Sequence, residues 1–134
     1  MKMYKSYGWK FDDDVAKQFD NHVRQSVYMY DEFHNSIVNM SRFFIEDNTN
    51  ILDIGTSTGE LLKKLYNDKN NCNYIGIDIE PPMIEQAKLK LPKQVRLEVG
   101  DILDYKIENC SIITMMLVLQ FIRPKDKQLV IDNI

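Results

Sequence analysis

The residues with the clearest potential for chemistry lie in a short glycine-rich segment, Asp53-Ile-Gly-Thr-Ser-Thr-Gly59. The segment follows the apolar run of residues 50–54 and precedes a helical pattern over residues 59–66. Open α/β sheets bind their ligands at loops between a strand and a helix, where glycine lets the backbone approach the ligand closely. The spacing therefore predicts a ligand site, and four chemistries use glycine-rich loops of this kind.

Three of these chemistries fit the loop poorly. Gly55-Thr-Ser-Thr-Gly59 has the pattern of a hydrolase nucleophile elbow, which needs a histidine after the serine, but His22 and His34 both precede it. A phosphate-binding P-loop ends in Gly-Lys-Ser/Thr, whereas Gly59 is followed by the acidic Glu60. The dinucleotide-binding motif Gly-x-Gly-x-x-Gly needs three glycines, and this loop supplies only one of them at the required positions.

The fourth chemistry is the binding of S-adenosylmethionine (SAM). Asp53, Gly55, Ser57 and Gly59 resemble the first motif of class I SAM-dependent methyltransferases, Asp/Glu-x-Gly-x-Gly/Ser-x-Gly. Such a loop suits a zwitterionic ligand, because glycine admits its methionyl part and a nearby carboxylate favours its ammonium group. The alternative is that the glycines only permit a tight turn between strand and helix.

Two further motifs follow in the order that this superfamily shows. Asp78 ends the second expected strand, where an acid is expected on the ribose hydroxyls, although a lone aspartate at that place is more often a helix cap. Gly100-Asp101-Ile102, after the third expected strand, resembles the superfamily's adenine-binding turn. Three motifs on three successive strand ends indicate SAM binding.

Short apolar runs alternate with helical patterns from residue 50 onward, and these elements must position the motifs. Strands are expected at residues 50–54, 74–78, 95–99 and 111–118, and helices at residues 59–66, 82–90 and 125–134. The alternation predicts an α/β fold with a Rossmann-like open sheet of the class I methyltransferase type, made of about four parallel strands behind N-terminal helices. Residues 1–134 are expected to form one SAM-binding domain, with residues 49–134 as its βαβ core.

Residues 1–48 are expected to form a helical cap at one end of the sheet. The first helix is indicated by apolar residues that recur every four positions, namely Phe11, Val15, Phe19 and Val23. The second begins near Tyr30 and ends before Asp47. Its inward face is expected to consist of Phe33, Ile37, Met40, Phe44 and Ile45.

Composition and charge limit the protein class. The 134 residues are 44% hydrophobic and 28% charged with a net charge of -3, which is typical of a globular domain. Cys72 and Cys110 form no C-x-x-C motif, which favours a cytoplasmic location and argues against a metal site. No run reaches the roughly 18 apolar residues of a membrane span, and residues 1–6 do not resemble a secretion signal. The absence of clustered cations argues against direct nucleic-acid binding.

Within this superfamily the chain most resembles the carboxy-SAM synthases, through residues 11–16, 24–30, 53–59, 82–85, 98–102 and 107–121. The resemblance implies a reaction of SAM with prephenate as the small-molecule second substrate. The product, carboxy-SAM, is used by a partner enzyme to modify a wobble uridine in tRNA. By position, the resemblance implies that Tyr30 packs on SAM and that Gly55, Thr56 and Ser57 hold its methionyl end. It also implies that Asp78 and Ile79 bind the ribose. Asp101 and Ile102 would bind the adenine.

Two departures from the family pattern leave the reaction open. Residues 26–30 lack the family's proline-glycine turn, and Met116 stands where the family has an asparagine able to bond a ligand. The family's substrate-binding arginine lies beyond Ile134, so Arg24 and Arg123 are the candidates nearest the site for holding a carboxylate. Carboxy transfer, methyl transfer and a non-catalytic SAM-binding module therefore remain alternatives, and no catalytic residue is assigned.

The number of strands raises a second question. The class I methyltransferase sheet has seven strands, so the last three are expected to be missing, and the fourth strand would become an exposed edge. Proteins generally avoid a long apolar edge strand. A second copy of the chain in a homodimer, or residues lost beyond Ile134, would cover it.

Overall fold

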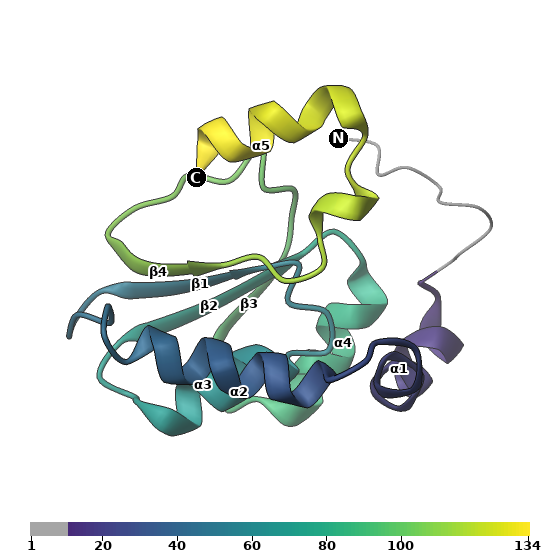
Figure 1. Ribbon diagram of the computed structural model, residues 1–134, viewed down its shortest axis with the longest axis horizontal. Helices are drawn as coiled ribbons and strands as arrows, with labels where there is room; N and C mark the ends of the chain where they lie inside the picture. Colours follow the sequence, from purple (N-terminus) through teal and green to yellow (C-terminus); the bar gives the residue numbers. More distant parts are fainter. Residues whose placement is uncertain (1–10) are drawn as a thin grey trace.

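Four parallel strands form one sheet between two helical layers in the computed structural model, which describes residues 11–134 (Figure 1). The strands are β1 (Asn50–Ile54), β2 (Asn73–Asp78), β3 (Arg96–Val99) and β4 (Cys110–Thr114), and their order in the sheet is β3-β2-β1-β4. The Rossmann-like open α/β sheet is confirmed. The expectation about a secretion signal concerns residues 1–6, which lie outside the described residues.

The helices cover the two faces of the sheet unequally (Figure 1). One face carries α2 (Tyr30–Ser41), α3 (Glu60–Asp68) and α4 (Pro81–Lys90), and the other carries α5 (Lys127–Asn133). Each face has its own buried cluster: Leu62 and Leu65 belong to the first, Leu52 and Val130 to the second. α1 (Asp13–Ser26) lies at the end of the sheet where the strands finish, and Asp12 caps it by accepting a hydrogen bond from the Val15 N–H at 3.0 Å.

The fourth strand is shorter than the predicted 111–118, because it ends at Thr114. Leu117 has a φ of 56°, a left-handed conformation that a strand cannot contain. The apolar run continues as an irregular segment into two 3₁₀ turns, Leu119–Phe121 and Pro124–Asp126. This apolar segment lines a cavity instead of extending the sheet.

The predicted inward face of the second helix is wrong in part. Phe33, Met40 and Phe44 are 53%, 62% and 63% exposed, whereas the residues of α2 that are buried are His34, Val38 and Ser41. The buried stripe of α2 is therefore rotated by about 100°, one residue position, from the predicted stripe. α2 also lies beside α3 on a face of the sheet, so only α1 occupies the position of a cap at the sheet's end (Figure 1). In residues 11–134, no helix has both the length and the apolar character to cross a membrane.

Candidate cofactor site

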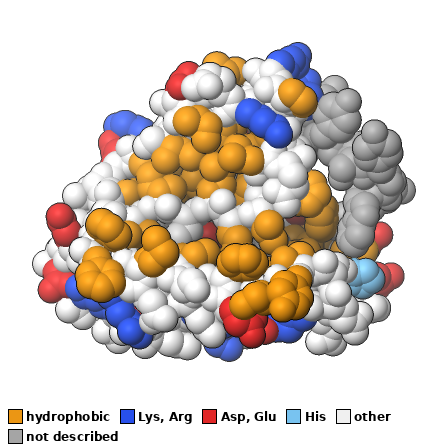
Figure 2. Space-filling view, in the orientation of Figure 1, with side chains coloured by type: hydrophobic (Ala, Val, Ile, Leu, Met, Phe, Trp, Pro, Cys, Tyr) orange, Lys and Arg blue, Asp and Glu red, His pale blue; other side chains and the backbone are white. Residues whose placement is uncertain are grey.

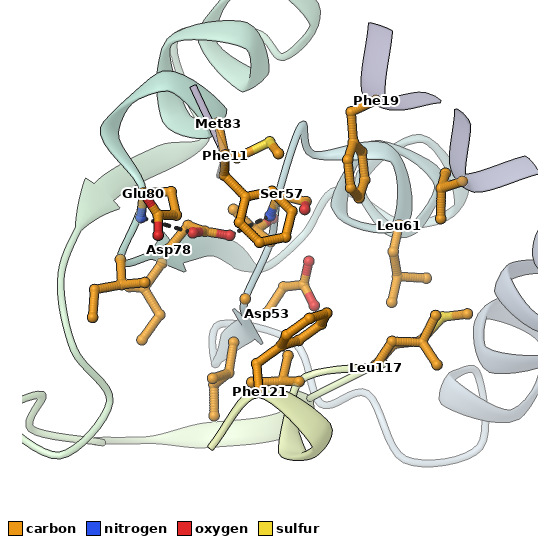
Figure 3. Close-up of a pocket in the computed structure, with 18 of the residues that line it drawn as sticks. Phe11, Phe19, Asp53, Ser57, Leu61, Asp78, Glu80, Met83, Leu117 and Phe121 are labelled. Carbon is orange, nitrogen blue, oxygen red and sulfur yellow. Dashed lines mark hydrogen bonds between the residues drawn. The ribbon is translucent and has the colours of Figure 1, made fainter. Parts of the chain in front are cut away.

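A cavity of about 510 Å³ opens where the strands end, between α1, the beginning of α2 and the loops that follow the four strands (Figure 3). The structure brings the three sequence motifs together here. Of the ten residues predicted to bind the cofactor, nine line the cavity: Tyr30, Asp53, Gly55, Thr56, Ser57, Asp78, Ile79, Asp101 and Ile102. Their contacts with a ligand stay predictions, but their convergence on one cavity is a property of the fold.

Gly59, the tenth residue, does not line the cavity and has a packing role. It begins α3 with a φ of 82°, and a Cβ added there would lie 2.6 Å from Leu91 Cδ1 and 3.2 Å from Ala87 Cβ. Glycine at this position therefore lets α3 approach α4. Gly55 does line the cavity, and two features favour glycine there: its φ is 67°, and an added Cβ would clash with Val118 Cγ2.

Asp78 holds the glycine loop in place. Its Oδ2 accepts a hydrogen bond from the Ser57 N–H at 2.8 Å, and its Oδ1 accepts one from the Glu80 N–H at 2.9 Å (Figure 3). The side chain is buried, and burial raises the pKa of its carboxyl. A carboxylate has about four acceptor positions, and backbone N–H groups of Ser57, Ile79 and Glu80 use three of them, so Asp78 can accept a further hydrogen bond from a ligand hydroxyl while it fixes the loop.

Asp53 and Asp101 are also engaged by the fold. Asp53 is buried at the end of β1, where its Oδ1 accepts a hydrogen bond from Thr114 Oγ1 at 2.7 Å and so links β1 to β4. Burial raises the pKa of Asp53 to about 6. Asp101 Oδ1 accepts a hydrogen bond from the Leu103 N–H at 3.0 Å, which shapes the turn after β3.

The charged side chains that line the cavity are all acidic. They are Asp14, Asp53, Asp78, Glu80 and Asp101, and no lysine or arginine of residues 11–134 joins them. A cavity lined by one sign of charge favours a ligand of the opposite sign, such as a sulfonium or ammonium group.

The two arginines considered for holding a carboxylate are engaged elsewhere. Arg24 pairs with Asp31 at 2.8 Å and with Glu60 at 3.1 Å. Arg123 pairs with Asp126 at 2.6 Å. Neither arginine lines the cavity. Residues 11–134 also contain no group of three or more His, Cys, Asp or Glu side chains arranged to hold a metal ion.

Sequence reasoning missed the apolar wall of the cavity. This wall consists of Phe11, Phe19, Met83, Leu117 and Phe121 (Figure 3). The Phe11 and Phe121 rings meet edge to face at 5.9 Å. The four-residue period of the first helix was the signal for this wall, but the same period is typical of a helix that packs on a core.

The comparisons agree with this geometry. A family model described as a methyltransferase domain matches residues 51–134. The chain belongs to the methyltransferase domain family. It is 40% identical over 134 residues to the carboxy-S-adenosyl-L-methionine synthase of Staphylococcus epidermidis, an alignment that covers 98% of this chain and 59% of that protein. With the synthase of Ruthia magnifica the identity is 37% over 129 residues, covering 92% of this chain and 54% of that one. The chain thus spans little more than half the length of these relatives.

Solved methyltransferase structures share the fold. A SAM-dependent methyltransferase from Methanococcus maripaludis aligns with a TM-score of 0.72 at 20% identity, over 93% of this chain and 58% of that one. SAM-bound CalS10, an amino pentose methyltransferase from Micromonospora echinaspora, aligns with a TM-score of 0.68 at 20% identity, over 86% and 49%. At these identities the likeness supports the architecture.

Proposed function

We propose that this methyltransferase-family chain binds SAM in the cavity and acts as a SAM-dependent transferase. The observation that carries the proposal is the meeting of a glycine loop and three strand-end aspartates in one cavity, with no lysine or arginine of residues 11–134 in its lining. SAM carries a positive sulfonium and an ammonium group, so the acidic lining fits it. The buried Thr56, whose hydroxyl lies beside the Asp53 carboxyl, adds a polar atom able to bond a ligand.

The proposed contacts follow the order of the strands. Gly55, Thr56 and Ser57 would hold the methionyl end, beside Tyr30. Asp78 would accept a ribose hydroxyl next to Ile79, because its carboxylate has an acceptor position left over from its backbone hydrogen bonds. Asp101 would accept the exocyclic amine of the adenine, with Ile102 against the ring.

Group transfer from SAM depends on position more than on acid or base catalysis. The bound cofactor supplies a carbon activated by its sulfonium. The chain contributes a fixed orientation of the cofactor through the glycine loop, and exclusion of water through the apolar wall of Phe11, Phe19 and Phe121. Methyl transfer is such a displacement and needs no dedicated general acid or base, whereas carboxylation of the SAM methyl group must also remove a proton from that carbon.

The names of the relatives favour one reaction, the synthesis of carboxy-SAM from SAM and prephenate. This reaction would give the chain a role in the modification of wobble uridine in tRNA, in the cytoplasm. The second candidate is a SAM-binding module without turnover. One observation favours the second candidate: prephenate is an anion, and the described cavity lining supplies no cation to bind it.

A product assay separates the two candidates. The protein is incubated with SAM, with and without prephenate, and the nucleoside products are followed by mass spectrometry. Prephenate-dependent carboxy-SAM supports the synthase. SAM that binds but is recovered unchanged in both incubations supports the module.

Binding itself is tested with Asp78→Ala, which removes the proposed ribose acceptor. We expect the variant to bind SAM more weakly by about 1–3 kcal/mol, the usual loss for a hydrogen bond to a charged group. Isothermal calorimetry gives the affinity, and thermal melting checks the fold. Asp104→Ala, an exposed aspartate outside the cavity, is the matched control. A folded Asp78→Ala variant with wild-type affinity would contradict the assignment.

A further inference from the structure

His34 is a buried polar residue of the cavity that neither the motifs nor the resemblance assigns. It lies in the second turn of α2, is 2% exposed, and lines the cavity. Its Nδ1 is buried and has no hydrogen-bond partner among the described residues. The imidazole packs on Tyr30, one turn earlier, with ring centroids 4.2 Å apart. A buried polar atom without a partner is rare in folded proteins, so this nitrogen calls for a ligand atom.

The chemistry of His34 limits what that atom can be. Burial lowers the pKa of the imidazole to about 4, so the ring is neutral at pH 7. A neutral imidazole carries one N–H donor, on Nδ1 or on Nε2 according to its tautomer. The contact with Tyr30 restricts the orientation of the ring.

The cavity lacks any stronger partner for an anionic group. The methionyl end of SAM carries an ammonium and a carboxylate. Several aspartates and Glu80 are available to the ammonium, whereas no lysine or arginine of residues 11–134 lines the cavity for the carboxylate. Among residues 11–134, the partners that the cavity lining offers this carboxylate are therefore histidines and neutral donors.

We propose that His34 binds the carboxylate of the cofactor's methionyl group by donating a hydrogen bond from its imidazole. The inference rests on the proposed binding of SAM, and it adds a binding residue on α2, outside the strand-end motifs. Tyr30 acts as the positioning residue for the ring. His34 thereby distinguishes SAM from nucleosides that lack the carboxylate.

The test compares SAM with decarboxylated SAM, which keeps the sulfonium and ammonium but lacks the carboxylate. The variants are His34→Phe, which keeps a ring against Tyr30 without nitrogens, and His34→Asn, whose amide nitrogen can replace the Nδ1 donor. Asn39→Ala, an exposed position on the same helix, is the control. Affinities are measured by calorimetry at pH 7.5, with thermal melting to verify each fold.

We expect His34→Phe to weaken SAM binding about tenfold, the scale of one hydrogen bond to a charged group, and to change the affinity for decarboxylated SAM less than twofold. His34→Asn should recover part of the loss. Equal weakening of both ligands, or no weakening in a folded variant, would overturn the assignment of His34 and leave SAM binding standing. A wild-type protein that binds neither ligand would overturn the proposed function and this inference together.

Discussion

Asp53 and His34 are buried titratable groups of one cavity, and burial disfavours the charged form of each. The pKa of Asp53 rises from 3.8 to about 6, and the pKa of His34 falls from 6.5 to about 4. Between pH 4 and 6 the folded chain binds more protons at Asp53 than the unfolded chain does, so this residue makes stability fall as pH rises. At His34 the unfolded chain binds more protons, so that residue makes stability rise over almost the same range. The two contributions oppose each other.

Removing one group should expose the effect of the other. In Asp53→Asn the amide oxygen can still accept the Thr114 hydrogen bond, but the titration is gone. As the pH rises from 4 to 7, we expect the unfolding free energy of the variant to increase by about 3 kcal/mol relative to that of the wild type. Urea denaturation at a series of pH values measures this difference, with the exposed Asp104→Asn as control. Stability curves that stay parallel would show that Asp53 does not titrate in this range.

α1 is held to the protein mainly by polar contacts. Ala16 is its only fully buried residue. Asp20 accepts a hydrogen bond from Thr58 Oγ1 at 2.5 Å and pairs with Lys90, which also pairs with Glu60 at 2.9 Å. These contacts join α1 to the glycine loop, α3 and α4. The apolar side of the helix faces the cavity, so α1 covers the site without being part of the core.

Weakening these contacts should speed the exchange of ligand. We expect Asp20→Asn to raise the dissociation rate of SAM several-fold, because it removes the charge that Lys90 pairs with, and we expect high salt to reduce the difference from wild type. Stopped-flow displacement measures the rate. Asp13→Asn, an exposed position on α1 that has no ion pair within residues 11–134, is the control. Equal rates in the two variants would mean that α1 does not limit ligand release.

The sequence predicted most elements because its local signals agree with the tertiary structure. The glycine loop marked the end of β1, and the buried runs at residues 50–54 and 74–78 matched β1 and β2 within one residue. The sequence pattern did not reveal the orientation of α2, because the stripe with Phe33 and Met40 is more apolar than the buried stripe with His34 and Ser41. Packing of α2 on α3 and the sheet decides which of the two stripes is buried. The hydrogen bonds of Asp78 to the loop depend on contacts between distant segments, which spacing alone does not show.

An apolar surface flanks the open edge of the sheet (Figure 2). β4 pairs with β1 on one side only. Beside it, Ile37 of α2 and Ile113 of β4 line a shallow hollow, and the neighbouring Phe33 and Met40 are largely exposed. Exposed apolar area next to an unpaired strand is typical of a surface that another polypeptide covers.

We propose that a second copy of the chain covers this edge, the alternative being polypeptide that follows Ile134 in a longer chain. Sedimentation velocity over a range of concentrations should then show a monomer–dimer equilibrium. Met40→Glu should shift it toward monomer by placing a charge in the interface, whereas Leu89→Glu, at a 79% exposed position on α4, should leave it unchanged. A wild-type chain that remains monomeric at every concentration would contradict the dimer.

The sheet order also has a consequence for how the chain folds. Ile51 of the central strand β1 pairs with Tyr74 of β2 and with Ile112 of β4, so its two neighbours come from very different distances along the chain. Closing the longer loop costs more chain entropy, and we expect β4 to join after β1, β2 and β3 have paired. Its arrival forms the Thr114 bond to Asp53 and brings Val118 against Gly55. We therefore expect the cavity to be completed only once β4 has joined the sheet.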